Sequence, residues 1–414
     1  MSGAARVAPA AASSVLPSGS HHLYVHVPFC RLLCAYCDFV TVGGRTAEMA
    51  RYVEALLSEL ARRAAPGLLT TIYFGGGTPS LMPAAAIERV VRGAVERWDA
   101  VPSEVTVEAN PSRRETPDWA GLRSAGVNRV SLGVQSLRDP ELSALTRGHS
   151  ADEALAAFRA ARAFFDNVSI DLIYAIPGQS LADWRDGLRA AIALEPDHLS
   201  LYALQLALQP DEWAAPPRAG ALRWRRRMEA RQDEELAADQ YRLAEELLAS
   251  AGYRHYELSS WARSGRESRH NQAYWERRAY TGIGAGAHSY DGSIRSWNVR
   301  NLDRYLEARP DCPSVEGQEA LSEPTRAFEA VALGLRMVDG FSRAAFVAEF
   351  GVDPLLRFPE PVASSRLAGL LEVDGDAVRL TPAGRLLANE VLVAFVPPAL
   401  TSVRQDWYDA VPTG

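Results

Sequence analysis

Three cysteines lie within eight consecutive residues and are the side chains of this sequence best placed to do chemistry. Cys30, Cys34 and Cys37 form a C-x3-C-x2-C motif, and thiolates are the ligands that protein-bound iron–sulfur clusters require. Phe39 stands where a further cysteine could have come. Three thiolates leave one iron of a [4Fe–4S] cubane open, whereas ferredoxin clusters and structural zinc sites usually have four protein ligands. The motif therefore predicts a cubane with one corner free for a small molecule.

The elements that must position this motif alternate between strands and helices. The predicted strands are Leu23–Val27, Thr70–Phe74, Glu104–Ala109, Arg129–Gln135, Asn167–Tyr174 and His198–Leu204. The predicted helices between them are Ala47–Ala64, Ala84–Trp98, Trp119–Ser124, Asp152–Ala163 and Leu181–Leu194. This alternation predicts an α/β fold with a parallel sheet, curved into a partial (β/α)6 barrel. The cysteine motif follows the first strand, at the end of the barrel where active sites form.

Neighbouring residues in each predicted strand differ in polarity. Successive side chains of a strand point to opposite faces, and helices would cover the apolar face, so the polar face should line the lumen. That face carries Tyr24, Glu108, Gln135 and Asp171, where ordinary barrels carry Val, Ile and Leu. Buried polar groups are costly unless they are paired. The pattern predicts a polar ligand inside the barrel, with mutual pairing or bound water as the alternative.

Composition narrows the classes of protein that fit. The 414 residues carry a net charge of −7 and 47% apolar side chains, which favours a cytoplasmic protein and opposes nucleic-acid binding. No apolar run reaches the ~18–20 residues that span a bilayer. The sequence has no lysine, so Schiff-base chemistry is excluded. Four cysteines, three of them clustered, do not make a disulfide scaffold, and Cys312 has no assigned role.

Changes in amino-acid composition divide the chain into segments. We expect a disordered tail over 1–20, a core barrel over 21–250, a connecting segment over 251–322, a C-terminal module over 323–400 and a tail over 401–414. A charged helix over Arg223–Ala251 should leave its Arg225–Arg227 cluster in solvent. In the C-terminal module, the expected elements are helices at Arg326–Met337, Arg343–Phe350, Ala363–Leu371 and Pro382–Val393, with a hairpin over 371–380. This order predicts a mostly helical, winged-helix-like packing module without a basic recognition helix.

Several motifs together identify a family. The cysteine motif, with Gly75-Gly76-Gly77-Thr78-Pro79 downstream, resembles the radical S-adenosylmethionine superfamily. More specifically, the sequence resembles the oxygen-independent coproporphyrinogen III oxidase-like family over about residues 22–400. Within that family it resembles the haem-chaperone (HemW) branch. The motifs that carry this resemblance are Tyr24-x-His26-x-Pro28-Phe29-Cys30, Glu108-Ala-Asn110-Pro111, Asn128-Arg129-x-Ser131-x-Gly133-x-Gln135-Ser136, Asp171-Leu172-Ile173-Tyr174 and Pro177-Gly178-Gln179.

The resemblance implies a radical S-adenosylmethionine fold and a set of site residues. It implies a [4Fe–4S] cluster on the three cysteines and S-adenosylmethionine on its open iron. Tyr24 and Tyr36 should flank the cofactor, and Gly76, Gly77 and Thr78 should bind its methionine end. Glu108 should take the ribose hydroxyls. Gln135, Arg147 and Asp171 should complete the pocket, although an ion pair of Asp171 with Arg147 or Arg129 is the alternative reading of that carboxylate.

The haem-chaperone branch carries an H-N-x-x-Y-W signature, which this chain has as His270-Asn271-Gln272-Ala273-Tyr274-Trp275. The resemblance implies haem binding by His270, Asn271, Tyr274 and Trp275, since imidazole ligates haem iron and aromatic rings stack on porphyrins. His26, His255 and His288 are rival ligands. The true oxidases have a further cysteine at the place of Phe39 and a longer N-terminal segment, which counts against oxidase activity here.

Three functions follow as hypotheses. The first is a haem chaperone that holds cluster, S-adenosylmethionine and haem and delivers haem to an acceptor protein, expected to be respiratory. The chaperone would have no transmembrane segment but could associate peripherally with a membrane, and its electron donor is not readable from the sequence. The second is a radical enzyme that oxidises coproporphyrinogen III or transfers a methyl or alkyl group. The third is a DNA-binding regulator, which the acidic net charge opposes.

Overall fold

The computed structural model describes residues 16, 19–64, 66–206, 219–309 and 314–397. Cys312 and the expected tail at 401–414 lie outside the described residues. Of the tail expected at 1–20, the described part is Leu16, which is buried, and 19–20. Ser20 already belongs to the first strand.

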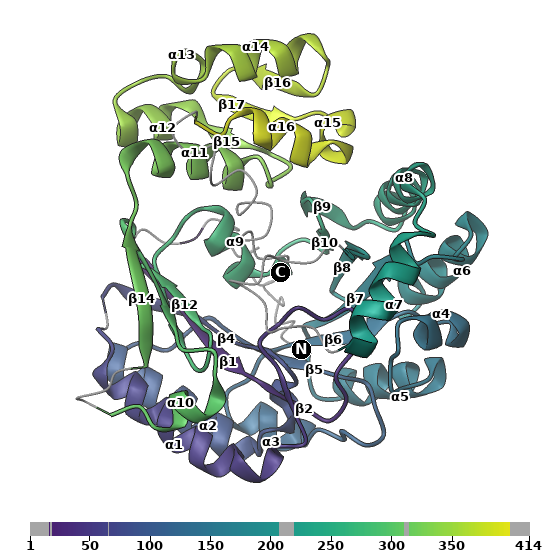
Figure 1. The fold of residues 1–414 in the computed structure, drawn as a ribbon, viewed down its shortest axis with the longest axis vertical. Coiled ribbons are helices and arrows are strands. Elements are labelled where there is room, and N and C mark those ends of the chain that lie inside the picture. The colour runs from purple at the N-terminus through teal and green to yellow at the C-terminus, as the bar shows by residue number, and fades with distance from the viewer. Residues whose placement is uncertain (1–15, 17–18, 65, 207–218, 310–313, 398–414) are drawn as a thin grey trace, which may run out of the picture.

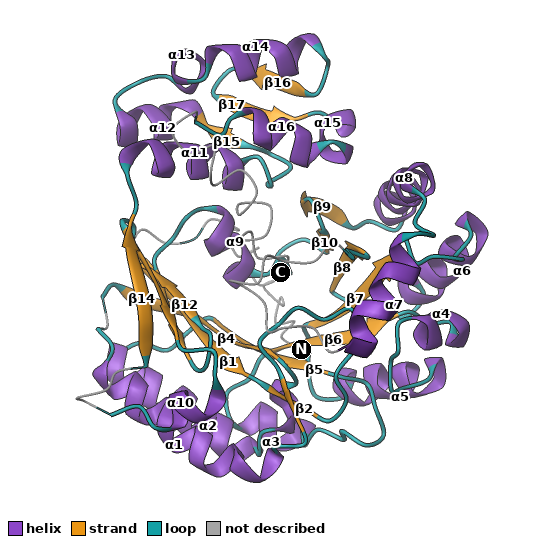
Figure 2. Ribbon diagram, viewed as in Figure 1, coloured by secondary structure: helices purple, strands orange, loops and turns teal. Residues whose placement is uncertain are grey.

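Six parallel strands form the centre of the molecule, as the sequence predicts. They are β1 (Ser20–Val27), β4 (Leu68–Gly76), β5 (Glu104–Ala109), β6 (Arg129–Gln135), β7 (Val168–Tyr174) and β8 (His198–Ala203), and they neighbour one another in chain order. The helices that connect or follow them are α1 (Met49–Arg62), α2 (Ala84–Trp98), α3 (Trp119–Ser124), α4 (Asp139–Ala144), α5 (Ala151–Arg162) and α6 (Leu181–Ile192). The helices lie outside the curved sheet, so the partial (β/α)6 barrel is confirmed (Figures 1 and 2).

The apolar face of these strands packs on the helices. Leu23, Val25, Ile72, Val107 and Ile170 are fully buried in one large core that also contains the inward sides of α1, α2, α5 and α6. Each of these helices has its apolar residues on one side, which is the arrangement that a surface helix uses to bury one stripe. The polar face of the strands is therefore turned to the lumen, as predicted.

The segment after the barrel extends the sheet at both ends. Strands β9 (Arg254–Glu257) and β10 (Ser260–Ala262) are antiparallel additions beyond β8. Strand β11 (Tyr280–Ile283) pairs in parallel with β1, and β12 (His288–Tyr290), β13 (Ile294–Asn298) and β14 (Val315–Ala320) continue from it. The described sheet thus has 12 strands. Between the two additions lies α9 (Arg269–Trp275), and α10 (Leu302–Leu306) follows β13.

The charged helix expected over 223–251 is two helices. They are α7 (Ala219–Glu229) and α8 (Glu234–Ser250), and the side chain of Asp233 caps α8 by accepting the Leu236 N–H at 3.0 Å. Aspartate competes for backbone donors in this way and so starts helices more readily than it continues them. The prediction of one continuous helix was wrong at this point.

A second, smaller core belongs to the C-terminal residues. It is built by α11 (Glu323–Gly334), α12 (Arg343–Phe350), α13 (Pro354–Arg357), α14 (Pro359–Leu367), α15 (Pro382–Leu386), α16 (Ala388–Ala394) and the three-stranded sheet of β15 (Phe341–Ser342), β16 (Leu371–Asp374) and β17 (Ala377–Leu380). The predicted hairpin is confirmed. The expected helix at 363–371 ends at Leu367, and the expected helix at 382–393 is divided at Leu387. No described helix is both long and apolar enough to cross a membrane.

Candidate functional site

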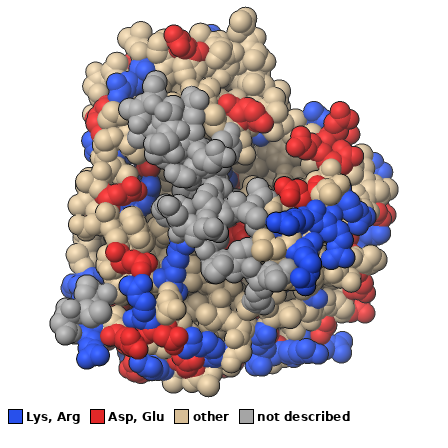
Figure 3. All heavy atoms as spheres, viewed as in Figure 1, with Lys and Arg blue, Asp and Glu red and all other residues tan. Residues whose placement is uncertain are grey.

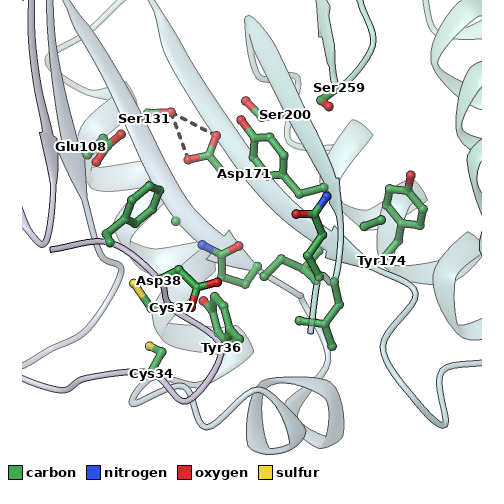
Figure 4. Close-up of a pocket in the computed structure, with 18 of the residues that line it drawn as sticks. Cys34, Tyr36, Cys37, Asp38, Glu108, Ser131, Asp171, Tyr174, Ser200 and Ser259 are labelled. Atoms are coloured by element: carbon green, nitrogen blue, oxygen red, sulfur yellow. Dashed lines mark hydrogen bonds between the residues drawn. The ribbon is translucent and has the colours of Figure 1, made fainter. Parts of the chain in front are cut away.

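One cavity of about 550 Å³ opens at the carboxyl ends of the barrel strands and reaches the C-terminal helices. Figure 4 shows Cys34 and Cys37 at one end of it and Tyr174 and Ser259 toward the other. Its volume is in the range of small-molecule sites. Its wall includes the three motif cysteines, Tyr36, Gly76, Gly77, Glu108, Gln135, Arg147 and Asp171. The structure therefore gathers residues from five strands and three loops around one space.

The cysteines lie on the loop that follows β1. Cys30 ends β2 (Phe29–Cys30), which pairs in parallel with β3 (Val42–Gly43), so the loop between them is closed at its base. The Cys37 N–H donates to the Cys34 carbonyl at 3.4 Å, which turns the chain between these two thiols. All three cysteines are free. Burial raises the pKa of Cys30 to about 11 and that of Cys37 to about 12, so neither ionises at neutral pH without a compensating cation.

The glycine run after β4 leaves no room for side chains. Gly76 has φ +111°, and a Cβ there would collide with the His26 ring. A Cβ on Gly77 would lie 2.8 Å from the Phe29 carbonyl oxygen. Glycine is required where backbone approaches so closely. The next residue, Thr78, is buried, and its hydroxyl donates to Cys30 Sγ at 3.7 Å, which ties the glycine edge to the cysteine loop.

Arg147 joins the cysteine loop to the barrel. Its Nη1 donates to Cys34 Sγ at 3.4 Å and to the Tyr36 hydroxyl at 3.2 Å. Its Nη2 donates to Asn110 Oδ1 at 2.7 Å and to the Gly133 carbonyl at 2.8 Å. A guanidinium has donors in a fixed fork, so these four acceptors fix its position. The same positive charge lies beside a thiol that a metal would deprotonate.

Glu108 is the penultimate residue of β5 and faces the glycine run. The Tyr73 hydroxyl donates to its Oε1 at 2.7 Å, and the Gly76 N–H donates to its Oε2 at 3.0 Å. Burial raises the pKa of this carboxyl to about 7, against the opposing effect of those two hydrogen bonds. The carboxyl therefore titrates near neutrality, and it is placed at the cavity wall where a hydroxyl-bearing ligand could meet it.

Asp171 and Gln135 complete the polar wall. The Ser131 hydroxyl lies 3.1 Å from both carboxylate oxygens of Asp171, and burial raises the pKa of that carboxyl. No ion pair joins Asp171 to Arg129 or Arg147 among the described residues, although the charge of Arg129 opposes the rise in the pKa of this carboxyl. Gln135 has φ +65°, a left-handed conformation that is costly for a residue with a side chain and that is seen at functional sites.

Tyr24 and Thr78 lie behind the cavity wall rather than in it. The Tyr24 hydroxyl lies 3.1 Å from His26 Nδ1, and its ring stacks on Tyr73 with a centroid distance of 6.3 Å. Asn110, which the sequence places on the polar face without a role, donates to the Thr78 hydroxyl at 2.8 Å. Tyr24 and Thr78 thus support residues that line the cavity, and Asn110 is one of the lining residues.

Arg225 is a site residue that the sequence did not reveal. The Arg225–Arg227 cluster was expected to be solvated, which holds for the exposed Arg226 and Arg227 on the basic face over α7 (Figure 3), but Arg225 is only 2% exposed. It pairs with Asp38 and donates to the Tyr36 carbonyl at 2.8 Å, so it holds the cysteine loop. The buried Trp224 at the neighbouring position was the available signal, because it marks the covered side of α7.

The residues present fit an iron–sulfur cubane rather than a single ion. Among the described residues, no three metal-ligating side chains gather around one point as a mononuclear site would need. A cubane separates its thiolate ligands by the width of its iron–sulfur core, and the three thiols line one cavity from one loop. Gly76, Gly77 and the polar wall of Glu108, Gln135 and Asp171 line the same cavity as the thiols, which gives a polar cofactor a place beside them.

The four residues expected to bind haem lie at α9 and differ in access. Asn271 lines the cavity. His270 is 1% exposed, its Nδ1 lies 2.7 Å from the Thr71 hydroxyl, and its Nε2 lies 3.0 Å from the Tyr274 hydroxyl. Trp275 is also buried. Ligation of a metal by His270 would therefore require the loss of one of its two hydrogen bonds.

The rival histidines are also engaged. His26 Nε2 lies 2.7 Å from the Val40 carbonyl oxygen. His255 stacks on Trp261 with a centroid distance of 4.1 Å, and its Nδ1 lies 3.3 Å from Glu245. His288 stacks near Trp297. None of these three rings lines the cavity as described.

Known proteins resemble this chain over nearly its whole length. The models of the radical SAM superfamily and of the HemN C-terminal domain match residues 24–191 and 321–387. The haem chaperone HemW of Bacillus subtilis (strain 168) is 32% identical over 90% of this chain and 98% of its own length. HemW of Mycobacterium tuberculosis (strain CDC 1551 / Oshkosh) is 37% identical over 91% and 95%. The chain belongs to the HemW family.

The fold of this HemW family member also resembles a solved structure. Coproporphyrinogen III oxidase (HemN) from Escherichia coli has a TM-score of 0.77, with 23% identity and coverage of 92% of this chain and 91% of that chain. At this identity the likeness shows the fold alone. The radical SAM fold and the HemW branch expected from the motifs are both confirmed.

Proposed function

We propose that this protein is a haem chaperone that binds a [4Fe–4S] cluster, S-adenosylmethionine and haem and delivers haem to an acceptor protein. The observation that carries the proposal is the similarity, over nearly the whole length of both chains, to proteins named haem chaperone. The expected acceptor is a respiratory haem protein. The net charge of −7 supports a cytoplasmic location, with peripheral membrane association as the way to reach a membrane-bound acceptor.

The cavity supports the cluster and cofactor parts of the proposal. Cys30, Cys34 and Cys37 would hold three irons, and a reduced cluster bound there supplies an electron to the sulfonium of S-adenosylmethionine. Gly76 and Gly77 admit the methionine end, because they offer bare backbone at the cavity wall. Glu108 accepts the ribose hydroxyls, while Gln135, Arg147 and Asp171 close the polar wall around the ligand. Tyr24, Tyr36 and Thr78 support this arrangement.

Haem binding is proposed at α9, which carries His270, Asn271, Tyr274 and Trp275 and meets the cavity at Asn271. Asn271 faces the cavity directly. Iron ligation by His270 would replace the contact of its Nε2 with Tyr274. Neutral imidazole is the form that ligates iron, and burial lowers the pKa of His270 well below its ordinary value. The ring is therefore already in the protonation state that ligation needs.

Oxidation of coproporphyrinogen III, or a related radical transfer, is the alternative activity. Phe39 occupies the position of the further cysteine that the resemblance assigns to the oxidases, and its ring is 55% exposed beside the cysteine loop. No observation on the described residues favours the oxidase over the chaperone. We therefore propose that the protein lacks this activity.

Anaerobic reconstitution with iron and sulfide, followed by haem titration and a coproporphyrinogen assay on one sample, tests the proposal. We expect a cluster whose electron paramagnetic resonance signal changes when S-adenosylmethionine is added, a Soret shift with haem, and no coproporphyrinogen turnover. His270→Ala and Tyr274→Ala should each weaken haem binding, whereas Arg92→Gln, at an exposed position on α2, should not. Coupled formation of 5′-deoxyadenosine and oxidised porphyrinogen would refute the chaperone.

A further inference from the structure

Arg336 is held rigidly at the outer part of the cavity. Its carbonyl accepts the Leu258 N–H at 2.9 Å, and the Val338 N–H donates to the Tyr256 carbonyl at 3.1 Å. The backbone on both sides of Arg336 is thus fixed to β9 and the turn after it. The Arg336 side chain lines the cavity, so its position is set by the barrel extension and not by the C-terminal helices alone.

The Arg336 guanidinium lacks a direct partner among the described residues. No hydrogen bond or ion pair is formed by it in that part of the chain, and its buried Nε has no acceptor. The Glu257 carboxylate raises the pKa of the guanidinium from beyond ion-pair distance. Its Oε2 already accepts the Ser259 N–H at 3.1 Å. Burial lowers the pKa of Arg336, as expected for a cation short of a counter-charge. Arg336 is half-buried, and a charge shielded from solvent without a partner is costly, so an anion in the cavity would be favoured.

Trp275 holds this guanidinium in place. The Arg336 Cζ atom lies 4.3 Å from the centroid of the Trp275 ring, within cation–π distance. Trp275 is only 3% exposed and ends α9, and its Nε1 is a second buried donor without a partner. The last residue of the H-N-x-x-Y-W signature therefore reaches the cavity through Arg336, while His270 is enclosed between β4 and α9.

Aromatic and apolar side chains form part of the cavity wall, alongside polar ones such as Ser259, Asn389 and Glu390. The aromatic and apolar part includes Tyr174, Tyr202, Tyr241, Leu258 and Leu386. Such a surface accepts a flat apolar ring system, and a cation beside it selects a ligand with an acidic group at its edge. Three more arginines line the cavity: Arg385 pairs with Glu245 at 2.8 Å, Arg147 has four acceptors, and Glu104 and Asp171 balance the charge of Arg129. Burial lowers the pKa of Arg336, whereas the pKa values of Arg129 and Arg147 are raised, because Arg336 has the least balancing negative charge of these three described arginines.

We propose that Arg336 binds a carboxylate of the cavity ligand and that Trp275 is a positioning residue for its guanidinium. The inference rests on the proposed function for the identity of the ligand, haem, whose propionates supply the carboxylates. This inference differs from the hypothesis that His270 ligates the haem iron, because it gives Trp275 a role in orienting an arginine. No covalent or redox step is involved.

Haem and haem dimethyl ester, titrated into the reconstituted full chain and followed by the Soret band, test the inference. The ester has the same ring and iron but no carboxylate. We expect Arg336→Gln to weaken haem binding roughly tenfold or more, as the loss of a charge-assisted pair does, and to leave ester binding unchanged. Trp275→Leu should weaken haem binding in the same selective way but less, and Trp275→Phe and Arg336→Lys should restore part of it. Arg92→Gln controls for the loss of one positive charge.

The outcomes separate the inference from the proposed function. Equal haem affinity in wild type and Arg336→Gln, with circular dichroism and iron content unchanged, overturns the inference and leaves the chaperone standing. Equal losses for haem and its ester also overturn it, because they would report a structural role. Wild type that binds neither haem nor the ester refutes haem binding itself and the ligand proposed for Arg336 with it.

Discussion

At the scale of single residues, the site depends on charged groups in the cavity wall that are largely shielded from solvent. Glu108 holds hydrogen bonds from Tyr73 and Gly76, yet burial keeps its pKa near 7. The guanidinium of Arg147 places one positive charge beside the cysteine loop, where it donates to Cys34 Sγ. Desolvation makes both groups sensitive to what binds beside them, which is the property expected of residues that meet a cofactor.

Glu108 should make stability depend on pH. Its carboxyl has a pKa of about 7 in the folded protein and about 4.5 when unfolded, so the folded state holds a proton that unfolding releases between these values. The free energy of unfolding must then fall as pH rises from about 4.5 to about 7. Glu108→Gln should reduce by roughly 2–3 kcal/mol the difference in the free energy of unfolding between pH 5 and pH 8. The free energy is measured by urea unfolding without added cofactor.

The exposed Glu88 on α2 provides the control for this experiment. Glu88→Gln should leave the pH dependence as in wild type. An equally steep dependence in Glu108→Gln would show that another group carries the effect.

Arg147 should raise the reduction potential of the cluster. Its Nη1 lies 3.4 Å from Cys34 Sγ, and positive charge and hydrogen bonds near cluster sulfurs favour the reduced form. Arg147→Gln should shift the midpoint potential to more negative values by tens of millivolts, as measured by redox titration with electron paramagnetic resonance detection. A potential that stays constant or rises at full iron occupancy would contradict the assignment, and Arg92→Gln is the charge-matched control.

At the scale of elements, a helix outside the cysteine loop determines where that loop lies. Helix α7 follows the sixth strand in sequence, but its Arg225 bonds to the carbonyls of Ala35 and Tyr36 and pairs with Asp38. The loop is thus fixed at one end by β2 and β3 and at its middle by α7. Between β2 and β3, the described residues of the cysteine loop make no strand pairing of their own, so their backbone carbonyls need other hydrogen-bond donors. Arg225 donates to two of these carbonyls and pairs with one carboxylate.

Arg225→Gln should loosen the cysteine loop. It leaves Asp38 unpaired and loses the bonds to two carbonyls, so we expect reconstituted protein to lose its iron severalfold faster in the presence of a chelator. The neighbouring Arg226 is exposed, and Arg226→Gln should lose iron at the wild-type rate. Identical rates for the two variants would show that α7 does not hold the loop.

At the scale of the whole molecule, two cores meet at one cavity. The barrel and the C-terminal residues each have their own apolar cluster, and the cavity wall includes Leu386, Ala388 and Asn389 from the C-terminal side. Figure 1 shows the C-terminal helices as a separate layer above the open end of the barrel. The ligand space is therefore completed by a unit that contributes none of the thiols.

The ion pair between Arg385 and Glu245 should couple these two units. The side chains lie 2.8 Å apart and are 13% and 21% exposed, so solvent screens them only in part. A double-mutant cycle with Arg385→Gln and Glu245→Gln should give a coupling free energy of about 1 kcal/mol in urea unfolding. The exposed pair of Arg92 and Glu96 should give a smaller value. Additive effects of the Arg385 and Glu245 substitutions would show that the pair does not join the units.

The sequence by itself determined the elements of the barrel and the chemistry of its cysteine loop. Alternating polarity placed the strand ends within three residues, because the period of a half-buried strand is local. The same alternation put Glu108, Gln135 and Asp171 on the lumen side, where the structure has them. The three thiols lie on one short loop, so their proximity needed no tertiary information.

Only the tertiary structure decided which distant residues complete the site. Arg225 lies 189 residues from the carbonyl that it binds, and His270 lies 199 residues from Thr71. Periodicity shows that a side chain is covered but not what covers it, which is why Arg225 was expected in solvent and His270 was expected to be available. The added strands at both ends of the sheet, and Arg336 against Trp275, depend on long-range packing, and no local pattern encodes the partner in such contacts.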